Sequence, residues 1–326
     1  MPSEKRSSSS LFTVLLAFGA NILVALAKTV AAVITGSASL VAEAAHSWAD
    51  AGNEIFLIQA ERAAAKPRDD SHPGGYGRDA YVWSLFAAVG LFTAGAVVSI
   101  MHGVSALGSE EKDTEYLIGY IVLAAAFVFE GISFIQSYRQ AHAKASSSGT
   151  GTFEHVLRTS NPTLRAVFAE DSAALGGLVI AFLGLLLHQL TGNAFWDALG
   201  SILVGVLLAI VAFVLIERNR RFLVGQPGSD RAWQVALSAL LQHPEVEKVT
   251  YLHIEYVGPE RFYLVAAVDL RGDDRESDVA LDLRDVEAEL ERSPWITEAV
   301  LTLSQPGAAA LIPDGSGERD ATQLRS

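Results

Sequence analysis

The sequence contains no cysteine, so neither disulfide bonds nor thiolate metal sites can form. Any metal site must therefore use His, Asp, Glu or backbone oxygen atoms. Charged residues are also scarce: they make up 19% of the 326 residues, whereas hydrophobic residues make up 50%. This composition is too apolar for an ordinary soluble domain and indicates a protein that crosses a membrane several times.

Basic residues are scarce in the last hundred residues, and two common hydrolase motifs are absent. Residues 227–326 hold 9 Lys and Arg against 19 Asp and Glu, which argues against nucleic acid or anionic lipid as a partner of this part. The chain has no Gly-x-Ser-x-Gly nucleophile element and no His-Glu-x-x-His motif on any apolar run, so a membrane hydrolase is disfavoured.

Six apolar runs are each long enough to cross a hydrocarbon core of about 30 Å, which takes about 20 helical residues. The runs are Leu11–Ile34, Leu40–Ala63, Val82–Leu107, Tyr116–Tyr138, Leu164–Leu190 and Phe195–Ile216. Residues 1–10 are short and Ser-rich, and no organelle-targeting peptide is evident. The sequence therefore predicts an α-helical membrane protein with six transmembrane helices within residues 11–222.

The basic residues between these runs predict the orientation. They gather on one side, at Lys5, Arg6, Arg62, Lys66, Arg68, Arg78, Arg139, Lys144, Arg158, Arg165, Arg218, Arg220 and Arg221. The other side has only Lys112. By the positive-inside rule both termini are cytoplasmic. Without a targeting segment, the plasma (inner) membrane of a bacterial-type cell is the default location.

A small cytoplasmic domain is predicted for residues 223–306, followed by a disordered tail over 307–326. Its patterns predict, in order, a helix, two strands flanking a turn at Gly258-Pro259, an amphipathic helix and a last strand. The predicted elements are Arg231–Leu241, Val246–Tyr256, Phe262–Leu270, Ser277–Glu291 and Ile296–Leu303. The order α-β-β-α-β predicts a ferredoxin-like α+β fold with its helices on one face of an open sheet.

The pair His46 and Asp50 carries the clearest chemical signal. The two residues lie four apart in the second apolar run, so on a helix they share one face. Ionisable groups are costly inside lipid and usually serve a function there. An imidazole nitrogen and a carboxylate oxygen are ligands that suit Zn²⁺ and related divalent ions. A structural polar pair that bridges two helices is the alternative.

Further elements surround this pair in a fixed order. They are Asn21, Lys28, Gly36–Leu40, Glu43, Asp69–Arg78, Glu170–Leu175, Trp196–Ala198 and Leu223–Gly225. In this order and spacing, the chain from about Phe12 to Pro306 resembles the cation diffusion facilitators, a family of membrane proteins that exchange divalent metal for protons. Six spans and a cytoplasmic α/β domain also match the layout of that family.

The resemblance implies a transport site formed by His46 and Asp50 of the second span and Asp171 of the fifth. It implies that a divalent metal, most often Zn²⁺, is the substrate and that protons move the other way, with no prosthetic group. The same ligands would accept Mn²⁺, Fe²⁺ or Co²⁺. The resemblance also implies a homodimer paired through the soluble domain.

One position departs from the family pattern. A fourth ligand usually lies four residues before the Asp of the fifth span, and this position is Val167 here. The departure resembles a subgroup with Glu-Asp-Ser in the fifth span, which is linked mainly to zinc. We therefore expect either three protein ligands plus water or the recruitment of Glu170 or Asn53.

The family's second, loop-borne metal site aligns with Asp69, His72 and Tyr76. That site often uses an Asp and two His residues, so the Tyr favours an ordinary loop turn over a metal site. Glu43, one turn before His46, is either an accessory ligand or a carboxylate bonded to another helix.

Three more polar residues lie inside the predicted spans. Asn21 and Lys28 share one face of the first span, where a supporting role is expected for both. Glu130 in the fourth span fits a proton relay and an interhelical contact equally well.

Two other functions would use the same residues. A membrane metal sensor or scaffold would bind ions without moving them, and a passive divalent channel would conduct them without proton exchange. Ligands in the middle of a six-span bundle favour transport over the sensor, and a channel would usually place rings of ligands along a pore.

Overall fold

The structure is a computed structural model that describes residues 4–108, 115–272 and 274–313. Three predicted features lie outside the described residues. They are residues 1–3 of the N-terminal segment, Lys112, and the part of the predicted disordered tail beyond residue 313. The described chain divides into two compact units. One combines Met1–Glu61 with Val82–Arg220, and the other combines Arg62–Tyr81 with Arg221–Ser326.

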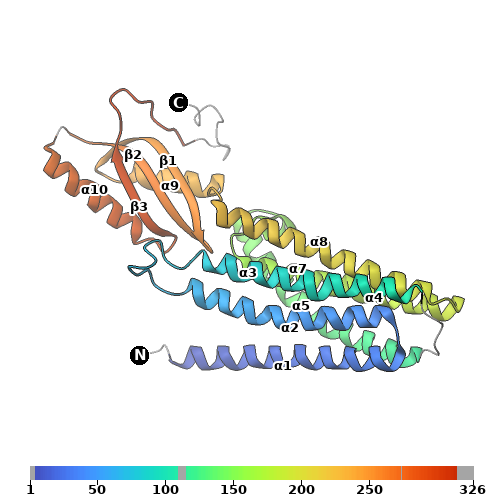
Figure 1. Cartoon of the computed structure of the whole chain (residues 1–326). Helices are drawn as coiled ribbons and strands as arrows, with labels where there is room; N and C mark the ends of the chain where they lie inside the picture. Colours follow the sequence, from blue (N-terminus) through green and yellow to red (C-terminus); the bar gives the residue numbers. More distant parts are fainter. Residues whose placement is uncertain (1–3, 109–114, 273, 314–326) are drawn as a thin grey trace. The chain divides into compact units, whose positions relative to one another are not determined.

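The first unit is built from long helices (Figure 1). They are α1 (Glu4–Thr35), α2 (Ala38–Ala64), α3 (Asp79–Gly90), the π-helical turn η1 (Leu91–Val97), α4 (Val98–Ala106), α5 (Tyr116–Ser148), α6 (Thr152–Arg158), α7 (Pro162–Thr191) and α8 (Phe195–Val224). The segments α3, η1 and α4 follow one another without a break, so the third apolar run contains a π-helical turn of 7 residues. Such turns often occur at functional sites.

Five stretches of the described residues are long and apolar enough to cross a membrane, and they make the chain a multi-pass integral membrane protein. They are Phe18–Thr35, Asp79–Ala106, Tyr116–Ser146, Pro162–Thr191 and Phe195–Val224. They correspond to five of the six predicted spans. The helix α2 is not among them because it carries several charged residues, including Glu43, Asp50 and Glu54.

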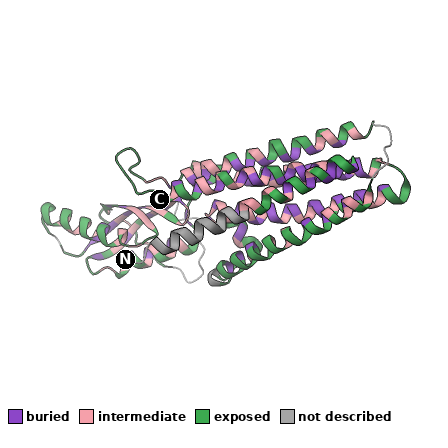
Figure 2. Cartoon of the chain, turned by 90° about the horizontal axis from the view of Figure 1, so that it is seen from below, coloured by how far each residue is buried: buried purple, intermediate pink, exposed green. Residues whose placement is uncertain are grey.

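The helices bury one side and expose another (Figure 2). Small alanines of α2 pack in one core cluster with Leu91 of η1 and Val204 and Leu208 of α8. Large apolar side chains lie exposed elsewhere on the same unit, for example Met101, Val128 and Phe213. An exposed apolar surface of this kind suits contact with lipid.

Asp197, at the start of α8, fixes the start of α2. Its buried carboxylate accepts hydrogen bonds from the hydroxyl groups of Ser37 and Ser39 and from the backbone N–H groups of Ala38 and Ser39. A carboxylate at a helix N-terminus satisfies N–H groups that have no partner within the helix and interacts favourably with the helix dipole. Two sequence elements 160 positions apart therefore meet to hold the helix that carries His46 and Asp50.

We predict that Asp197→Ala lowers the free energy of unfolding by about 2–3 kcal/mol, because several hydrogen bonds to one buried charged group are lost. Thermal unfolding in detergent measures the change. Asn193 is a matched control, since its side chain accepts a single exposed bond from the backbone N–H of Phe195. We expect Asn193→Ala to cost about 1 kcal/mol or less. Equal losses for the two variants would contradict the role given to Asp197.

The second unit contains the predicted small α/β domain. Its elements are α9 (Asp230–Gln242), β1 (Val246–Gly258), β2 (Arg261–Leu270), α10 (Glu276–Glu291) and β3 (Ile296–Leu303), so the order α-β-β-α-β is confirmed within one or two residues at most boundaries. The sheet has the order β1-β2-β3, with β1 antiparallel and β3 parallel to β2. Alternate strand residues form one core with Trp233 and Leu237 of α9 and Val286 of α10, so both helices cover the same face.

The connection between α2 and α3 belongs to the same compact unit as this domain and packs against it. Arg78 pairs with Glu255 of β1, and Arg68 lies 3.5 Å from Glu291 of α10. A methyl group added to Gly77 would lie only 2.4 Å from the carbonyl oxygen of Val257, so this close approach requires glycine. The sequence analysis considered this loop as a family motif and a candidate metal site, and it did not predict this packing.

Past β3, the chain is described to residue 313. There the N–H of Leu311 donates to the carbonyl oxygen of Val249 at 2.7 Å, and the Leu311 side chain packs against the domain core. The segment from Gly307 to Pro313, expected to be disordered, therefore has a defined contact in the structure.

Candidate metal site

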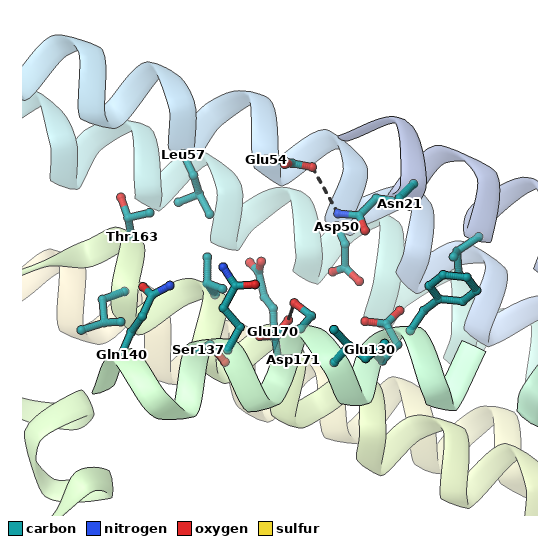
Figure 3. A pocket seen from close by; sticks show the side chains of 18 of the residues that line it. Asn21, Asp50, Glu54, Leu57, Glu130, Ser137, Gln140, Thr163, Glu170 and Asp171 are labelled. Carbon is teal, nitrogen blue, oxygen red and sulfur yellow. Dashed lines mark hydrogen bonds between the residues drawn. The ribbon is translucent and has the colours of Figure 1, made fainter. Parts of the chain in front are cut away.

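A polar cavity of about 520 Å³ lies inside the helical unit, between α1, α2, α5 and α7 (Figure 3). Its wall is rich in oxygen-bearing side chains. The carboxylates among them are Asp50, Glu54, Glu61, Glu130, Glu170 and Asp171. Hydroxyl and amide groups from Asn21, Ser47, Ser133, Gln136, Ser137, Gln140, Asn161 and Thr163 complete the polar lining. Such a concentration of hard oxygen donors inside a membrane bundle is suited to a divalent cation.

The helix α2 positions His46 and Asp50 as the sequence predicts, one turn apart. The Nδ1 atom of His46 lies 3.4 Å from Oδ1 of Asp50. His46 is completely buried and neither of its ring nitrogens has a hydrogen-bond partner, and Oδ1 of Asp50 also lacks one. Asp50 faces the cavity, whereas His46 is not among the residues that line it. The pair thus holds unsatisfied ligand atoms at the cavity wall and just behind it.

The helix α7 contributes Glu170 and Asp171 from the opposite side. This helix begins at Pro162 and is capped by the side chain of Asn161, which accepts from the N–H of Leu164 at 3.0 Å. Oδ1 of Asp171 accepts a hydrogen bond of 3.0 Å from Ser133 of α5, while its buried Oδ2 has no partner. Asp171 therefore presents one free acceptor in the cavity wall.

Glu170 is adjacent to Asp171 in the sequence yet lines the same cavity. Its Oε1 accepts a hydrogen bond of 3.1 Å from the side-chain amide of Asn53 on α2. Adjacent residues point about 100° apart around a helix, so Glu170 and Asp171 cannot point in the same direction. Glu170 contacts α2 and Asp171 contacts α5. Both residues line the cavity because it lies between those two helices.

The structure brings three of the predicted or possible ligands, Asp50, Glu170 and Asp171, to one cavity together with Asn21 and Glu130, and it leaves His46 outside the cavity wall. Among the described residues, no three His, Asp or Glu side chains converge closely enough to enclose an ion. The set of ligands that closes around a metal therefore stays a prediction.

A buried ion-pair triad lies next to this cavity and joins three helices. Lys28 of α1 donates a 3.0 Å hydrogen bond to Glu43 of α2 and lies 3.7 Å from Glu130 of α5. Lys28 and Glu43 are fully buried, whereas Glu130 also lines the cavity. A methyl group at Gly177 of α7 would lie 2.4 Å from the free Oε1 of Glu43, so glycine provides the space for this carboxylate.

These contacts give Glu43 a partner on another helix, which is one of the two predicted alternatives. Lys28 is deep in the bundle and does not reach an interface. Asn21, which shares a face of α1 with Lys28, donates instead to Glu54 at 3.2 Å. Lys28 thus supplies positive charge to a region that otherwise holds several carboxylates.

We predict that Lys28→Met lowers the free energy of unfolding by about 3–5 kcal/mol, because removing one partner leaves buried carboxylates without their counter-charge. The double variant Lys28→Met with Glu43→Gln should recover part of the loss, since it removes the uncompensated charge as well. Thermal unfolding in detergent at a fixed pH measures both. A double variant as unstable as Lys28→Met alone would contradict charge pairing as the cause.

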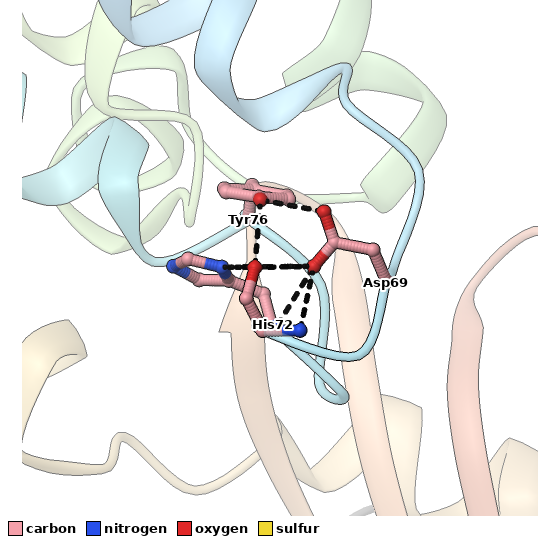
Figure 4. A network of polar contacts seen from close by, with 4 residues as sticks. Asp69, His72 and Tyr76 are labelled. Atoms are coloured by element: carbon pink, nitrogen blue, oxygen red, sulfur yellow. Dashed lines mark hydrogen bonds and ion pairs between the residues drawn. The ribbon is translucent and has the colours of Figure 1, made fainter.

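The predicted loop site forms a compact turn (Figure 4). Oδ1 of Asp69 accepts hydrogen bonds from the backbone N–H groups of Ser71 and His72, and its Oδ2 accepts from the Tyr76 hydroxyl at 2.7 Å. The His72 ring stacks on Tyr76 with centroids 3.8 Å apart. Hydrogen bonds from Ser71 and Tyr76 lower the pKa of Asp69 to about 2. Because protein donors already use both carboxylate oxygens, this geometry favours the loop-turn interpretation.

Two carboxylates of the cavity wall were absent from the sequence-based predictions. Glu54 and Glu61 line the cavity on the same helix as Asp50, four and eleven residues after it. A helical projection of the second apolar run would have placed them on the face of Asp50, since 3.6 residues complete one turn. Ser133, the donor to Asp171, could not be found this way because it lies on another helix.

The fold and the cavity define a multi-pass membrane protein with a cation-suited site inside its bundle. Comparison with known proteins agrees: residues 14–224 match the model of the cation efflux transmembrane domain. The chain is 34% identical over 233 residues to metal tolerance protein C4 of Arabidopsis thaliana, covering 72% of this chain and 51% of the relative. It therefore belongs to the cation diffusion facilitator family, as the motifs suggested.

Other relatives carry more specific names. Over 245 residues the chain is 31% identical to the human mitochondrial proton-coupled zinc antiporter SLC30A9, covering 75% of this chain and 43% of the relative. The magnetosome protein MamM of Magnetospirillum gryphiswaldense is 24% identical over 243 residues, with 72% of this chain and 69% of the relative covered. The matched part spans about half the length of the first two relatives.

Proposed function

We propose that this protein is a secondary active transporter, not an enzyme, that exports divalent metal cations from the cytoplasm in exchange for protons. The observation that carries the proposal is the cavity in which Asp50, Glu170 and Asp171 face one another from α2 and α7 within a bundle of membrane helices. Buried oxygen atoms without partners, Oδ1 of Asp50 and Oδ2 of Asp171, leave capacity for a cation or a proton there. Membership of a family of cation transporters supports the same function.

The proposed metal ligands are His46, Asp50 and Asp171. Val167, which occupies the position of the family's usual fourth ligand, lines the cavity and offers no donor atom. We propose that water completes the coordination, with Glu170 next to Asp171 as the nearest replacement, and that the chain belongs to the Glu-Asp-Ser subgroup. The contacts of Asn53 and Glu43 favour supporting roles for these two residues.

Zn²⁺ is the proposed main substrate. Three His and carboxylate ligands with an open position suit this ion, and the relatives named zinc antiporters point to the same metal. Because such ligands also bind Mn²⁺, Fe²⁺ and Co²⁺, the ranking of metals has to be measured.

Exchange for protons follows from the chemistry of the ligands. Metal and proton compete for the same lone pairs of His46, Asp50 and Asp171, so binding of one displaces the other. Rocking of the helices would then expose the loaded site to the far side, where protons release the metal. The ion-pair triad of Lys28, Glu43 and Glu130 holds a lysine beside the site, paired with two carboxylates, and Glu130 lines the cavity, where a proton relay would lie.

The membrane potential sets the energetic value of this exchange. Moving two positive charges out against 100 mV costs about 4.6 kcal/mol, at about 2.3 kcal/mol for each charge. Exchange for two protons cancels this cost, and exchange for one proton leaves half of it.

We propose that α2 is the sixth span, since its alanines pack in the core cluster with η1 and α8 despite its charges. The basic loops support cytoplasmic termini, and we retain the plasma membrane as the location. Pairing of two copies through the α/β domain is proposed as well, and the ferredoxin-like assignment of that three-stranded domain stays a prediction.

Transport in liposomes tests the proposal. The protein is reconstituted with a pH gradient, and uptake of Zn²⁺, Mn²⁺, Fe²⁺, Co²⁺ and Cd²⁺ is recorded together with proton movement. We predict metal uptake matched by proton release, which Asp171→Ala reduces to the level of liposomes without protein because a ligand is lost.

Other results would favour other functions. Flux that survives in Asp171→Ala would show that the site is elsewhere. Metal flux without proton movement would indicate a channel, and binding without flux would indicate a sensor. Glu154→Gln serves as the control, since Glu154 is exposed on α6 and pairs with Arg158 outside the cavity.

A further inference from the structure

A stripe of carboxylates continues along α2 from the proposed site toward the end of the helix. Asp50, Glu54 and Glu61 all line the cavity, and Leu57 lies between the last two in the same wall. At about 1.5 Å of rise for each residue, Glu54 lies about 6 Å and Glu61 about 16 Å along the helix from Asp50. The three carboxylates therefore extend from the deep part of the cavity to the last turn of α2, which ends at Ala64.

The two outer carboxylates, Glu54 and Glu61, share the cavity wall with one basic residue, Lys144 of α5. Glu54 is partly buried and accepts one hydrogen bond, from Asn21, whereas Glu61 is exposed. Within the described residues, neither forms an ion pair with a lysine or arginine. Glu217 and Glu154, in contrast, pair with Arg220 and Arg158. Carboxylates that serve only solubility need not face a cavity.

The opposite walls also carry charge, with Glu130 on α5 and Glu170 and Asp171 on α7, alongside neutral polar groups. The helix α5 contributes Gln136, Gln140 and Lys144, and α7 contributes Thr163 and Val167. Figure 3 shows Gln140 and Thr163 toward one end of the cavity, and Asp50 and Glu130 toward the other. Toward the end marked by Gln140 and Thr163, a cation thus meets the outer carboxylates of α2, with amide and hydroxyl oxygens across from them. Near Asp50 it meets carboxylates from α5 and α7 as well.

The deep part of the cavity also holds a buried acceptor without a protein partner. Asp171 is more than nine-tenths buried, and its Oδ2 has no partner although it belongs to a residue of the cavity wall. A buried carboxylate oxygen without a donor is costly unless a cation or a proton reaches it. The stripe on α2 leads to this acceptor and to Asp50.

We propose that Glu54 and Glu61 form a relay that collects hydrated divalent cations and passes them to Asp50, without acting as ligands of the transport site. A cleft lined by one sign of charge raises the local concentration of the opposite ion and its association rate by about 10-fold to 1000-fold. This attraction acts through an intervening water molecule, so Glu54 and Glu61 need not contact the ion directly. The metal ligands of the transport site can therefore be other residues. The inference rests on the proposed transport function.

Charge-neutral variants test the relay. Glu54→Gln preserves an oxygen that accepts from Asn21, so it removes charge and keeps the hydrogen bond. For Glu54→Gln combined with Glu61→Gln, we expect the Zn²⁺ concentration at half-maximal uptake to rise about 10-fold, with the maximal rate unchanged. In the wild type that concentration should rise with added KCl because salt screens the stripe, and this dependence should be weaker in the variant.

Controls separate the relay from other roles. Glu154→Gln removes one negative charge outside the cavity, as Glu61→Gln does in the cavity wall, and should behave as wild type. Glu61→Gln alone, at an exposed position, should give part of the effect even if the double variant folds poorly, and Glu61→Asp should restore it. An unchanged half-maximal concentration would overturn the relay. Loss of the maximal rate in Glu54→Gln, as in Asp171→Ala, would make Glu54 a ligand and overturn it as well.

The relay can fail independently of transport. If the wild-type protein moves metal but the variants match it, only the relay is wrong. If the wild-type protein moves no metal, stopped-flow association of Zn²⁺ with the detergent-solubilised protein still tests the relay. The double variant should then bind about 10-fold more slowly, and equal association rates would contradict the inference.

Discussion

The burial of carboxylates inside an apolar bundle is the constraint on which the rest of this structure depends. An unpaired charge in a low-dielectric interior is expensive, so each such group needs a cation, a proton or several hydrogen-bond donors. Lys28 forms ion pairs with Glu43 and Glu130. Asn53 donates a hydrogen bond to Glu170, and Ser133 donates one to a single oxygen of Asp171. Carboxylate oxygens without a partner remain on Glu43, Asp50 and Asp171, and the last two residues line the cavity. The cavity therefore gathers unsatisfied acceptors at the place where an ion is proposed to bind.

The helix contacts of the first unit serve this arrangement. The carboxylate of Asp197 holds the start of α2, and Gly177 of α7 leaves the space that Glu43 needs to reach Lys28. Small residues allow helices to approach closely in a membrane, where the hydrophobic effect gives little drive for association. These contacts keep α2, the least apolar of the long helices, between neighbours that can satisfy its charged groups. The same helix then carries the proposed ligands and the carboxylate stripe.

The sequence predicted features that depend on one segment at a time. The strands and helices of the α/β domain were predicted almost residue by residue, because alternation and amphipathic spacing are local. The pair His46 and Asp50 was found for the same reason. Contacts between helices were not predictable: the bond from Ser133 to Asp171, the link from Lys28 to Glu43, and the packing of Gly77 against the domain each depend on how distant segments meet. The π-helical turn at Leu91–Val97 had no local signal either, since its composition is that of any apolar helix.

The chemistry of the cavity also explains why a transporter could function with an incomplete set of ligands. A site that is to release its ion cannot bind it as tightly as a structural zinc centre, in which four strong ligands enclose the metal. This chain has no thiolate, and it places Val167 where a fourth ligand could stand. Carboxylates and imidazole accept protons at accessible pH, whereas water leaves readily. Three such ligands beside a fixed lysine charge therefore favour reversible exchange of metal and proton over permanent retention of the metal.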